Sequence, residues 1–209
     1  MRGPHNGGRS DSFINSAPGS GVMPKSESSG LSTPHPEDVF VVHGRDGALR
    51  DSMFAFLRAI GLHPLEWSEA IAATGHPSPY VGEVLDRAFS MAQAIVVLLS
   101  PDDEARLKPH FIRPSDPSYE SDLTGQARPN VLFEAGMAMA RDPRRTILVE
   151  IGVLRPFSDI GGRHVVRLDN TTERRQDLAG RLDSAGCRVN LRGTDWHRVG
   201  ILVPTLREG

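Results

Sequence analysis

The chain has 209 residues, of which 38% are hydrophobic and 24% charged, a composition that suits one globular domain of ordinary size. Its formal net charge of −2 gives no broad attraction for nucleic acid or for an anionic membrane surface, so we expect neither as a partner. The single cysteine, Cys187, excludes an internal disulfide and a cysteine-rich zinc site, and no window is apolar enough to span a bilayer, which favours a cytoplasmic protein without a metal.

The first 36 residues are rich in Gly, Ser and Pro and lack any run of large apolar side chains. Such a segment cannot bury enough surface to offset the entropy lost when its chain becomes ordered. We therefore predict a disordered tail over residues 1–36 and one domain over residues 37–209. The tail is either an over-long gene start, with Met23 as the true initiator, or a flexible tether; the first interpretation is favoured because the tail carries no motif.

The domain is predicted to begin with a strand over 39–42, which is β-branched and aromatic and ends in a short turn. Asp46 is the expected N-cap of the next helix, whose apolar residues recur at three- and four-residue spacing until Gly61. The elements that follow are a strand over 62–67, a long loop over 68–79 and a helix over 79–92 that opens on a proline.

Residues 94–99 form the most apolar run of the chain, and a run without alternation is typical of a strand covered on both faces. Residues 101–129 carry charge and proline with little periodicity, which predicts a long loop or flap; loops of this length inside a domain are often functional. After the flap we expect a helix over 130–141, strands over 146–151 and 164–168, a last helix over 173–185, and Trp196 and His197 packing the terminal segment onto the sheet.

Five strands that alternate with helices require crossover connections, which are right-handed and place helices on both faces of a parallel sheet. The prediction is a flavodoxin-like α/β fold: a doubly wound, parallel five-stranded sheet with strand order 2-1-3-4-5. In this order the first and third strands are neighbours, and their carboxyl ends border the crevice in which such sheets bind ligands. The turns over residues 43–46 and 100–103 are therefore expected to face each other across one pocket.

Three sequence blocks occur in order at domain spacing: Val-Phe-Val-Val-His-Gly-Arg-Asp (39–46), Val-Val-Leu-Leu-Ser-Pro-Asp-Asp (96–103) and Arg-Pro-Asn-Val-Leu-Phe-Glu-Ala-Gly (128–136). Together they resemble the TIR-like domains of bacterial predicted nucleotide-binding proteins, a family that includes TIR effectors of antiphage cyclic-nucleotide signalling systems. The resemblance covers about residues 39–186. It implies a TIR-like, flavodoxin-like fold and a role in antiviral defence.

The resemblance also implies a hydrolase that cleaves the bond between nicotinamide and ribose in NAD+, with or without cyclisation of the product; NAD+ is then the substrate, and no cofactor is needed. Glu83 stands at the start of the helix after the long loop, where the resemblance implies the catalytic glutamate. A carboxylate there stabilises an oxocarbenium-like ribose, and the helix N-terminus keeps it ionised. The neighbours of Glu83 differ from the family pattern, and Glu66 and Glu69 are the alternatives if the register is shifted. Gly82 indicates either close approach of a ligand or a later helix start.

The other candidate residues lie at the two turns and at the start of the helix over 130–141. Arg45 is a candidate phosphate ligand or one half of a surface ion pair, and Glu134 is expected to brace the pocket rather than to react. Asp102 and Asp103 are candidates for binding ribose hydroxyls or for capping a turn. The complete set of predicted substrate-binding residues is His43, Gly44, Arg45, Asp46, Ser100, Asp102, Asp103, Arg128, Asn130 and Glu134.

Two other functions stay open. One is a non-enzymatic TIR module that signals by assembling through residues 68–79 and the adjacent helix. The other is a nucleoside deoxyribosyltransferase-like enzyme, because such enzymes share the flavodoxin-like sheet and an Asn-x-x-x-Glu helix like that of Asn130 and Glu134. The expected partners are NAD+ or a related nucleotide, further copies of the chain on activation, and a separate sensor protein or an activator bound by the flap.

Overall fold

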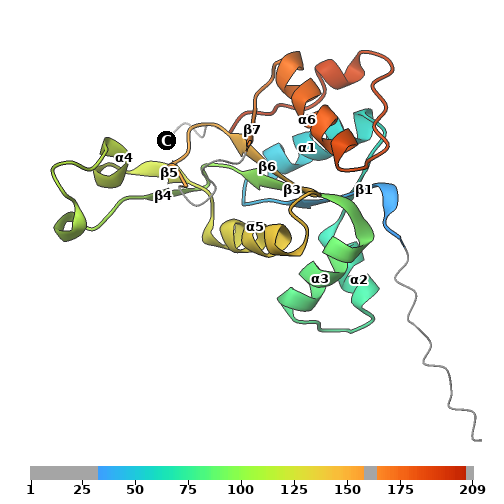
Figure 1. Ribbon diagram of the computed structural model, residues 1–209, viewed down its shortest axis with the longest axis horizontal. Helices are drawn as coiled ribbons and strands as arrows, with labels where there is room; N and C mark the ends of the chain where they lie inside the picture. Colours follow the sequence, from blue (N-terminus) through green and yellow to red (C-terminus); the bar gives the residue numbers. More distant parts are fainter. Residues whose placement is uncertain (1–32, 158–163, 206–209) are drawn as a thin grey trace, which may run out of the picture. The chain divides into compact units, whose positions relative to one another are not determined.

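The fold is a parallel five-stranded sheet with helices on both faces (Figure 1). The computed structural model describes residues 33–157 and 164–205, so most of the predicted tail lies outside the described residues. The sheet has the order β2-β1-β3-β6-β7, and every neighbouring pair in it is parallel. Since β4 and β5 belong to a separate two-stranded sheet, this order is the predicted 2-1-3-4-5, and the predicted flavodoxin-like fold is confirmed.

The central strands are long and buried, whereas the edge strands are short. β1 begins at His35, four residues before its predicted start, because its first residues also pair with the beginning of β3. All side chains from Ala94 to Leu99 are buried, as expected of a strand that is covered on both faces. The five strands are β2 (His63–Leu65), β1 (His35–Val42), β3 (Ala92–Leu99), β6 (Thr146–Ile151) and β7 (Val166–Leu168).

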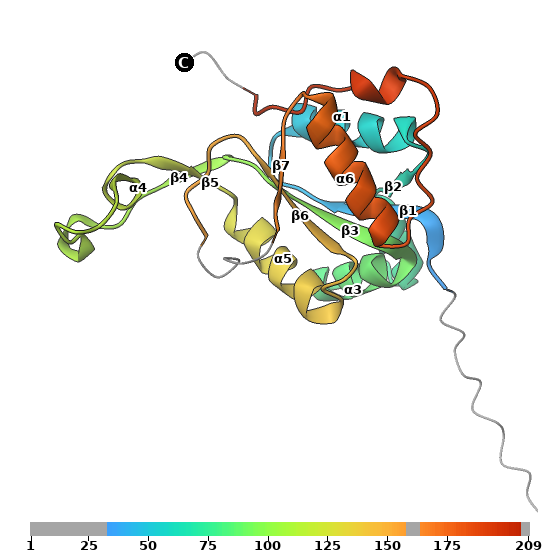
Figure 2. The same ribbon diagram turned by 45° about the horizontal axis from the view of Figure 1, so that its top comes forward.

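Two hydrophobic clusters fill the space on the two faces of the sheet (Figure 2). Val39 and Val41 of β1 point to one cluster, and Phe40 and Val42 point to the other, following the period of two of a strand. The first face is covered by α1 (Gly47–Ala59) and α6 (Thr172–Ser184), and the second by α3 (Val81–Met91) and α5 (Pro129–Arg141).

The segment predicted as a long loop over 68–79 contains a helix, α2 (Trp67–Thr74), which ends at Gly75 in the left-handed region. The periodicity of a helix is weak here because Ala70 is its only fully buried residue. α3 begins at Val81, two residues after the predicted start. A Cβ added to Gly82 would have no neighbour within 4 Å, so no other part of the described chain approaches this glycine closely.

The flap over residues 101–129 is built around a hairpin that projects from the carboxyl edge of the sheet (Figures 1 and 2). Its strands pair antiparallel and have three residues each, too short for a visible alternation of apolar and polar residues. The flap contains β4 (Asp103–Ala105), the 3-10 turn η1 (Pro109–Phe111), the short helix α4 (Ser118–Ser121) and β5 (Thr124–Gln126).

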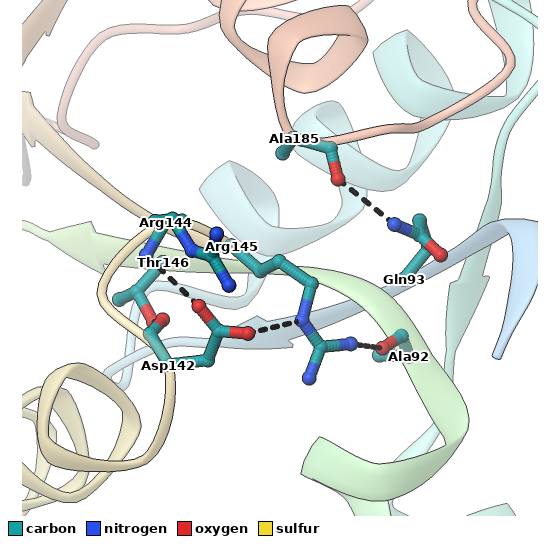
Figure 3. A network of polar contacts seen from close by, with 7 residues as sticks. All are labelled: Ala92, Gln93, Asp142, Arg144, Arg145, Thr146 and Ala185. Atoms are coloured by element: carbon teal, nitrogen blue, oxygen red, sulfur yellow. Dashed lines mark hydrogen bonds and ion pairs between the residues drawn. The ribbon is translucent and has the colours of Figure 1, made fainter. Parts of the chain in front are cut away.

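The amino edge of the sheet is closed by a polar network (Figure 3). Arg145 donates to the carboxylate of Asp142 at 2.8 Å and to the carbonyl of Ala92 at 3.0 Å. Gln93 donates to the carbonyl of Ala185 at 2.8 Å. These bonds connect the turn before β6 and the end of α6 to the start of β3, so the polar groups at this edge have a structural role.

The segment after α6 returns over the first face and is fixed by a buried cation. Arg175 is 1% exposed and donates to the carbonyls of Val199 at 2.6 Å and Gly200 at 2.9 Å. Trp196, in the short turn η3 (Asp195–His197), joins the core, which agrees with the predicted packing of this segment. None of the helices within residues 33–157 and 164–205 has the length and apolar character of a membrane span.

Candidate functional site

The turn after β1 touches the turn after β3 at the carboxyl edge of the sheet. The backbone N–H of Arg45 donates to Oδ2 of Asp102, and the hydroxyl of Ser100 donates to Oδ1 of the same carboxylate at 2.6 Å. A Cβ on Gly44 would overlap Oδ2 of Asp102 and would lie 2.8 Å from its Cγ. A side chain at position 44 would therefore displace the carboxylate of Asp102, which lies at the centre of the predicted switch-point crevice.

Asp46 links this crevice to the last described residue of the chain. Its carboxylate caps α1 by accepting from the N–H of Leu49 at 2.9 Å, and it accepts from both the N–H and the hydroxyl of Thr205 at 2.8 Å. Burial opposes ionisation of Asp46, but the hydrogen bonds from Leu49 and Thr205 outweigh it and lower the pKa of the carboxyl. The role of Asp46 in this structure is thus to hold the turn and the C-terminal segment together.

A depression of about 570 Å³ opens beside these residues, on the side of the sheet edge where α1 begins. Two carboxylates and the exposed Arg45 border it, so the depression is polar and carries charges of both signs. Its wall on the C-terminal side was not foreseen from the sequence, because Thr205 lies 159 residues from Asp46 and no local pattern joins them. The lining residues are Arg45, Asp46, Gly47, Ala48, Pro101, Asp102, Pro204 and Thr205.

The other predicted binding residues lie at the same edge but do not all meet. His43 is half-buried, with Nδ1 3.0 Å from the carbonyl oxygen of Gly44. Asp103 pairs with Gln126 in the hairpin at the root of the flap. Arg128 and Asn130 lie at the start of α5, where Arg128 is the N-cap residue and makes no side-chain capping bond.

Glu83 is not gathered into the crevice around Asp102. Its side chain is 48% exposed, accepts from the N–H of Tyr80 at 3.1 Å and lies 3.6 Å from Nδ1 of His76. It borders a separate depression of about 380 Å³ together with Arg141, the last residue of α5. That end of α5 leads into the start of β6, so the depression extends toward the amino edge of the sheet. Of the alternatives, Glu66 precedes α2 without a side-chain capping bond and Glu69 lies in its first turn.

Glu134 occupies a different position on the same side of the molecule. The buried face of α5 is formed by Val131, Ala135 and Ala138, and Glu134 stands at the margin of this face. At 100° per residue Glu134 shares its flank with Arg141, which forms an ion pair with Asp86 of α3. Glu134 therefore lies on the flank of α5 that carries this ion pair to α3, two turns and roughly 10 Å closer to the carboxyl edge than Arg141.

Burial sets the protonation behaviour of Glu134. It raises the pKa of the Glu134 carboxyl above the ordinary value of 4.5. No ion pair or hydrogen bond from the described residues reaches this carboxyl group. A carboxyl group kept partly from water and without a fixed partner differs from the bracing group expected from the sequence, and perturbed acids of this kind concentrate at functional sites.

A second cavity at the carboxyl edge, of about 280 Å³, lies under the root of the flap. Arg155 holds the flap here: its N–H donates to the carbonyl of Gly125 at 2.7 Å, and its guanidinium forms an ion pair with Glu120. Leu99 and Leu132 provide part of the apolar lining. No pattern in the sequence indicated this latch, because both of its charged residues lie in segments without periodicity.

Among the residues that the structure describes, no three His, Cys, Asp or Glu side chains are grouped as a metal would require. Cys187 is buried, and burial raises the pKa of its thiol to about 12, so its surroundings do not favour a thiolate nucleophile.

A search of the curated proteins found no match to this chain. A family model does match: residues 38–170 fit the CAP12/Pycsar effector protein, TIR domain. The match spans more than half of the chain and includes all three sequence blocks, over residues 39–46, 96–103 and 128–136. The chain therefore belongs to the TIR domain family of CAP12/Pycsar effector proteins.

Proposed function

We propose that this TIR effector domain cleaves the nicotinamide–ribose bond of NAD+, with Glu134 as the reacting carboxylate. The observation that carries the proposal is the position of Glu134, partly buried on the flank of α5 that faces α3, toward the carboxyl edge of the sheet. The resemblance of the sequence assigned this role to Glu83. The exposure of Glu83 and its bond to Tyr80 favour a helix-capping role for that residue instead.

The chemistry requires a carboxylate more than any other group. When the N-glycosidic bond breaks, its electron pair stays with the nicotinamide nitrogen, which loses its positive charge, and the ribose C1′ becomes an oxocarbenium ion. A carboxylate beside C1′ stabilises that charge, and water then adds to C1′ and releases a proton to solvent. Partial burial strengthens this stabilisation because the interaction acts through less water.

Other residues of the edge are suited to holding the substrate. Arg45 is exposed and forms no ion pair with the described residues, so its guanidinium is free to donate two hydrogen bonds to a phosphate. The start of α5 opens with Pro129 after Arg128, and its free N–H groups favour an anion or a polar edge. These features support binding of a nucleotide next to Glu134.

Two isosteric variants test the proposal. Purified Glu134→Gln and Glu83→Gln proteins are incubated with NAD+ across a range of protein concentrations, because TIR enzymes act in assemblies, and free nicotinamide, ADP-ribose and cyclic products are measured. We expect Glu134→Gln to lose turnover by on the order of 10²-fold or more, while Glu83→Gln stays within about threefold of the parent. Circular dichroism verifies that both variants fold.

The outcomes separate the candidates. Loss of turnover in Glu83→Gln with an active Glu134→Gln protein returns the role to Glu83. If both variants still cleave NAD+, neither Glu134 nor Glu83 is the reacting carboxylate. If the parent protein cleaves no NAD+ at any concentration, the enzymatic function is refuted.

A second candidate function is a TIR module that signals by self-association without turnover. Its supporting observation is the exposure of Tyr80 (82%) and Val81 (62%) where α2 connects to α3. Large apolar side chains exposed together mark interaction surfaces. If light scattering shows self-association that Tyr80→Ser abolishes, while no NAD+ is consumed in the assembled state, this function replaces the first.

A further inference from the structure

The flap ends in a basic tip, which we define as residues 105–115. It contains Arg106, Lys108 and Arg113 and no acidic residue, although the chain as a whole is slightly acidic. All three basic residues are exposed, and none forms an ion pair with another described residue. The tip thus presents three exposed positive charges at the end of a projecting hairpin (Figure 2), with the carboxylates of Glu104 and Asp116 directly at its two ends.

An aromatic pair lies among these charges. Phe111 is 61% exposed, and its ring centroid is 4.1 Å from that of His110 in the 3-10 turn η1. Phe111 is thus a large apolar side chain that the fold leaves in water and that another molecule can cover. A flat ring surrounded by cations is suited to stacking a planar base beside a phosphate.

One hydrogen bond joins the two arms of the flap, and a second one closes a local turn beside the tip. The N–H of Leu107 donates to the carbonyl of Glu120 at 2.8 Å, and the N–H of Arg113 donates to the carboxylate of Asp116 at 2.8 Å. The charge of Glu120 is in turn compensated by Arg155. Asp116 keeps its negative charge next to the tip, whereas the charge of Glu120 is compensated. The hydrogen bonds order the backbone that carries the basic side chains before any ligand binds.

We propose that the basic tip binds single-stranded nucleic acid, with the three cations on phosphates and Phe111 stacked on a base. This inference is independent of NAD+ cleavage and concerns a surface that the crevice does not use. Local charge rather than net charge decides such binding, which is why the overall composition gives no indication of it. An anionic membrane fits less well, because the tip offers one large exposed apolar side chain and two prolines, Pro109 and Pro114.

The test is fluorescence anisotropy of the full chain with labelled 12-nucleotide oligo-dT and oligo-rU, titrated between 25 and 200 mM salt. Three phosphate contacts predict a slope of log affinity against log salt of about −2 for a single strand. We expect Lys108→Glu to weaken binding by on the order of tenfold and to flatten the slope. Phe111→Ala should weaken binding by a similar factor without changing the slope, because stacking is not ionic.

Arg192→Glu is the matched control, since it makes the same change of charge at an exposed residue outside the flap and should leave binding unchanged. The inference is overturned if neither oligonucleotide binds at 25 mM salt, if Arg192→Glu weakens binding as much as Lys108→Glu, or if Phe111→Ala binds like the parent. Binding to phosphatidylserine vesicles that depends on Phe111, without binding to oligonucleotides, would identify a membrane-binding tip and overturn it as well.

Discussion

Replacement of Gly44 by alanine tests the crevice directly. Gly44 does not have a positive φ, so alanine is acceptable to its backbone and only the added methyl group matters. That methyl group would take the place of Oδ2 of Asp102, and the carboxylate would have to rotate away. It would then lose its bonds to the N–H of Arg45 and the hydroxyl of Ser100.

The cost follows from these two bonds. A charge-assisted hydrogen bond is worth about 1.5–3 kcal/mol, and the partial exposure of Asp102 reduces this to about 1–2 kcal/mol because water replaces the lost partner. Ser100 is 3% exposed, and its hydroxyl without an acceptor adds about 1 kcal/mol. The free energy of unfolding of Gly44→Ala should therefore fall by about 2–3 kcal/mol, which corresponds to roughly 5–10 °C in Tm.

Urea unfolding of four proteins measures this: the parent, Gly44→Ala, Asp102→Ala and the double variant. In the Asp102→Ala background the methyl group meets no carboxylate, so Gly44→Ala should cost less than about 0.5 kcal/mol and the two changes should be coupled by about 2 kcal/mol. Gly47→Ala is the control, because an added Cβ there has no neighbour within 4 Å. Additive effects in the cycle, or an equal loss in Gly47→Ala, would show that Asp102 does not require glycine at position 44.

Three further predictions concern charged or ionisable groups. Arg175→Met removes the donors to Val199 and Gly200 and should destabilise the protein by about 3 kcal/mol, with faster amide exchange in the segment after α6 as the specific readout. The pKa of Asp46 is lowered in the folded state, so the ionised carboxylate stabilises the fold fully at pH values well above 3.8, and this stabilisation is lost as the pH falls through and below that value. The free energy of unfolding of Asp46→Asn should therefore fall less between pH 6 and pH 3 than that of the parent protein. The thiol of Cys187, whose pKa burial raises to about 12, should react with Ellman's reagent at pH 8 only at the rate of unfolding, and rapid labelling of the native protein would contradict its burial.

The strand order was predictable because it depends on long apolar runs and on the handedness of crossovers. The run over residues 94–99 is buried on both faces, which predicts a central strand, and the right-handed crossovers before and after it place β1 and β6 beside it. α2 was missed because it buries a single alanine, and the hairpin of the flap was missed because three residues are too few to display a period of two. Helices and strands that bury little apolar surface leave only a weak periodic pattern in the sequence.

The candidate site was predictable only in part. The contact between the turns at Arg45 and Asp102 follows from the strand order alone. The position of Glu83 did not follow, since periodicity shows which face of α3 is buried but not how α3 lies against α5. The partial burial of Glu134 has the same origin, because it depends on the packing of α5 rather than on the residues beside Glu134 in the sequence.

The bond between Asp46 and Thr205 also determines when the crevice can be completed during synthesis. The two residues are 159 positions apart, so at 5–20 residues per second Asp46 leaves the ribosome's catalytic centre roughly 10–30 s before its partner is made. During that interval the depression lacks the wall formed by Pro204 and Thr205. We expect nascent chains stalled before Val199 to leave the Asp46 carboxylate without its partner Thr205, so the depression gains this wall only after Thr205 has been made.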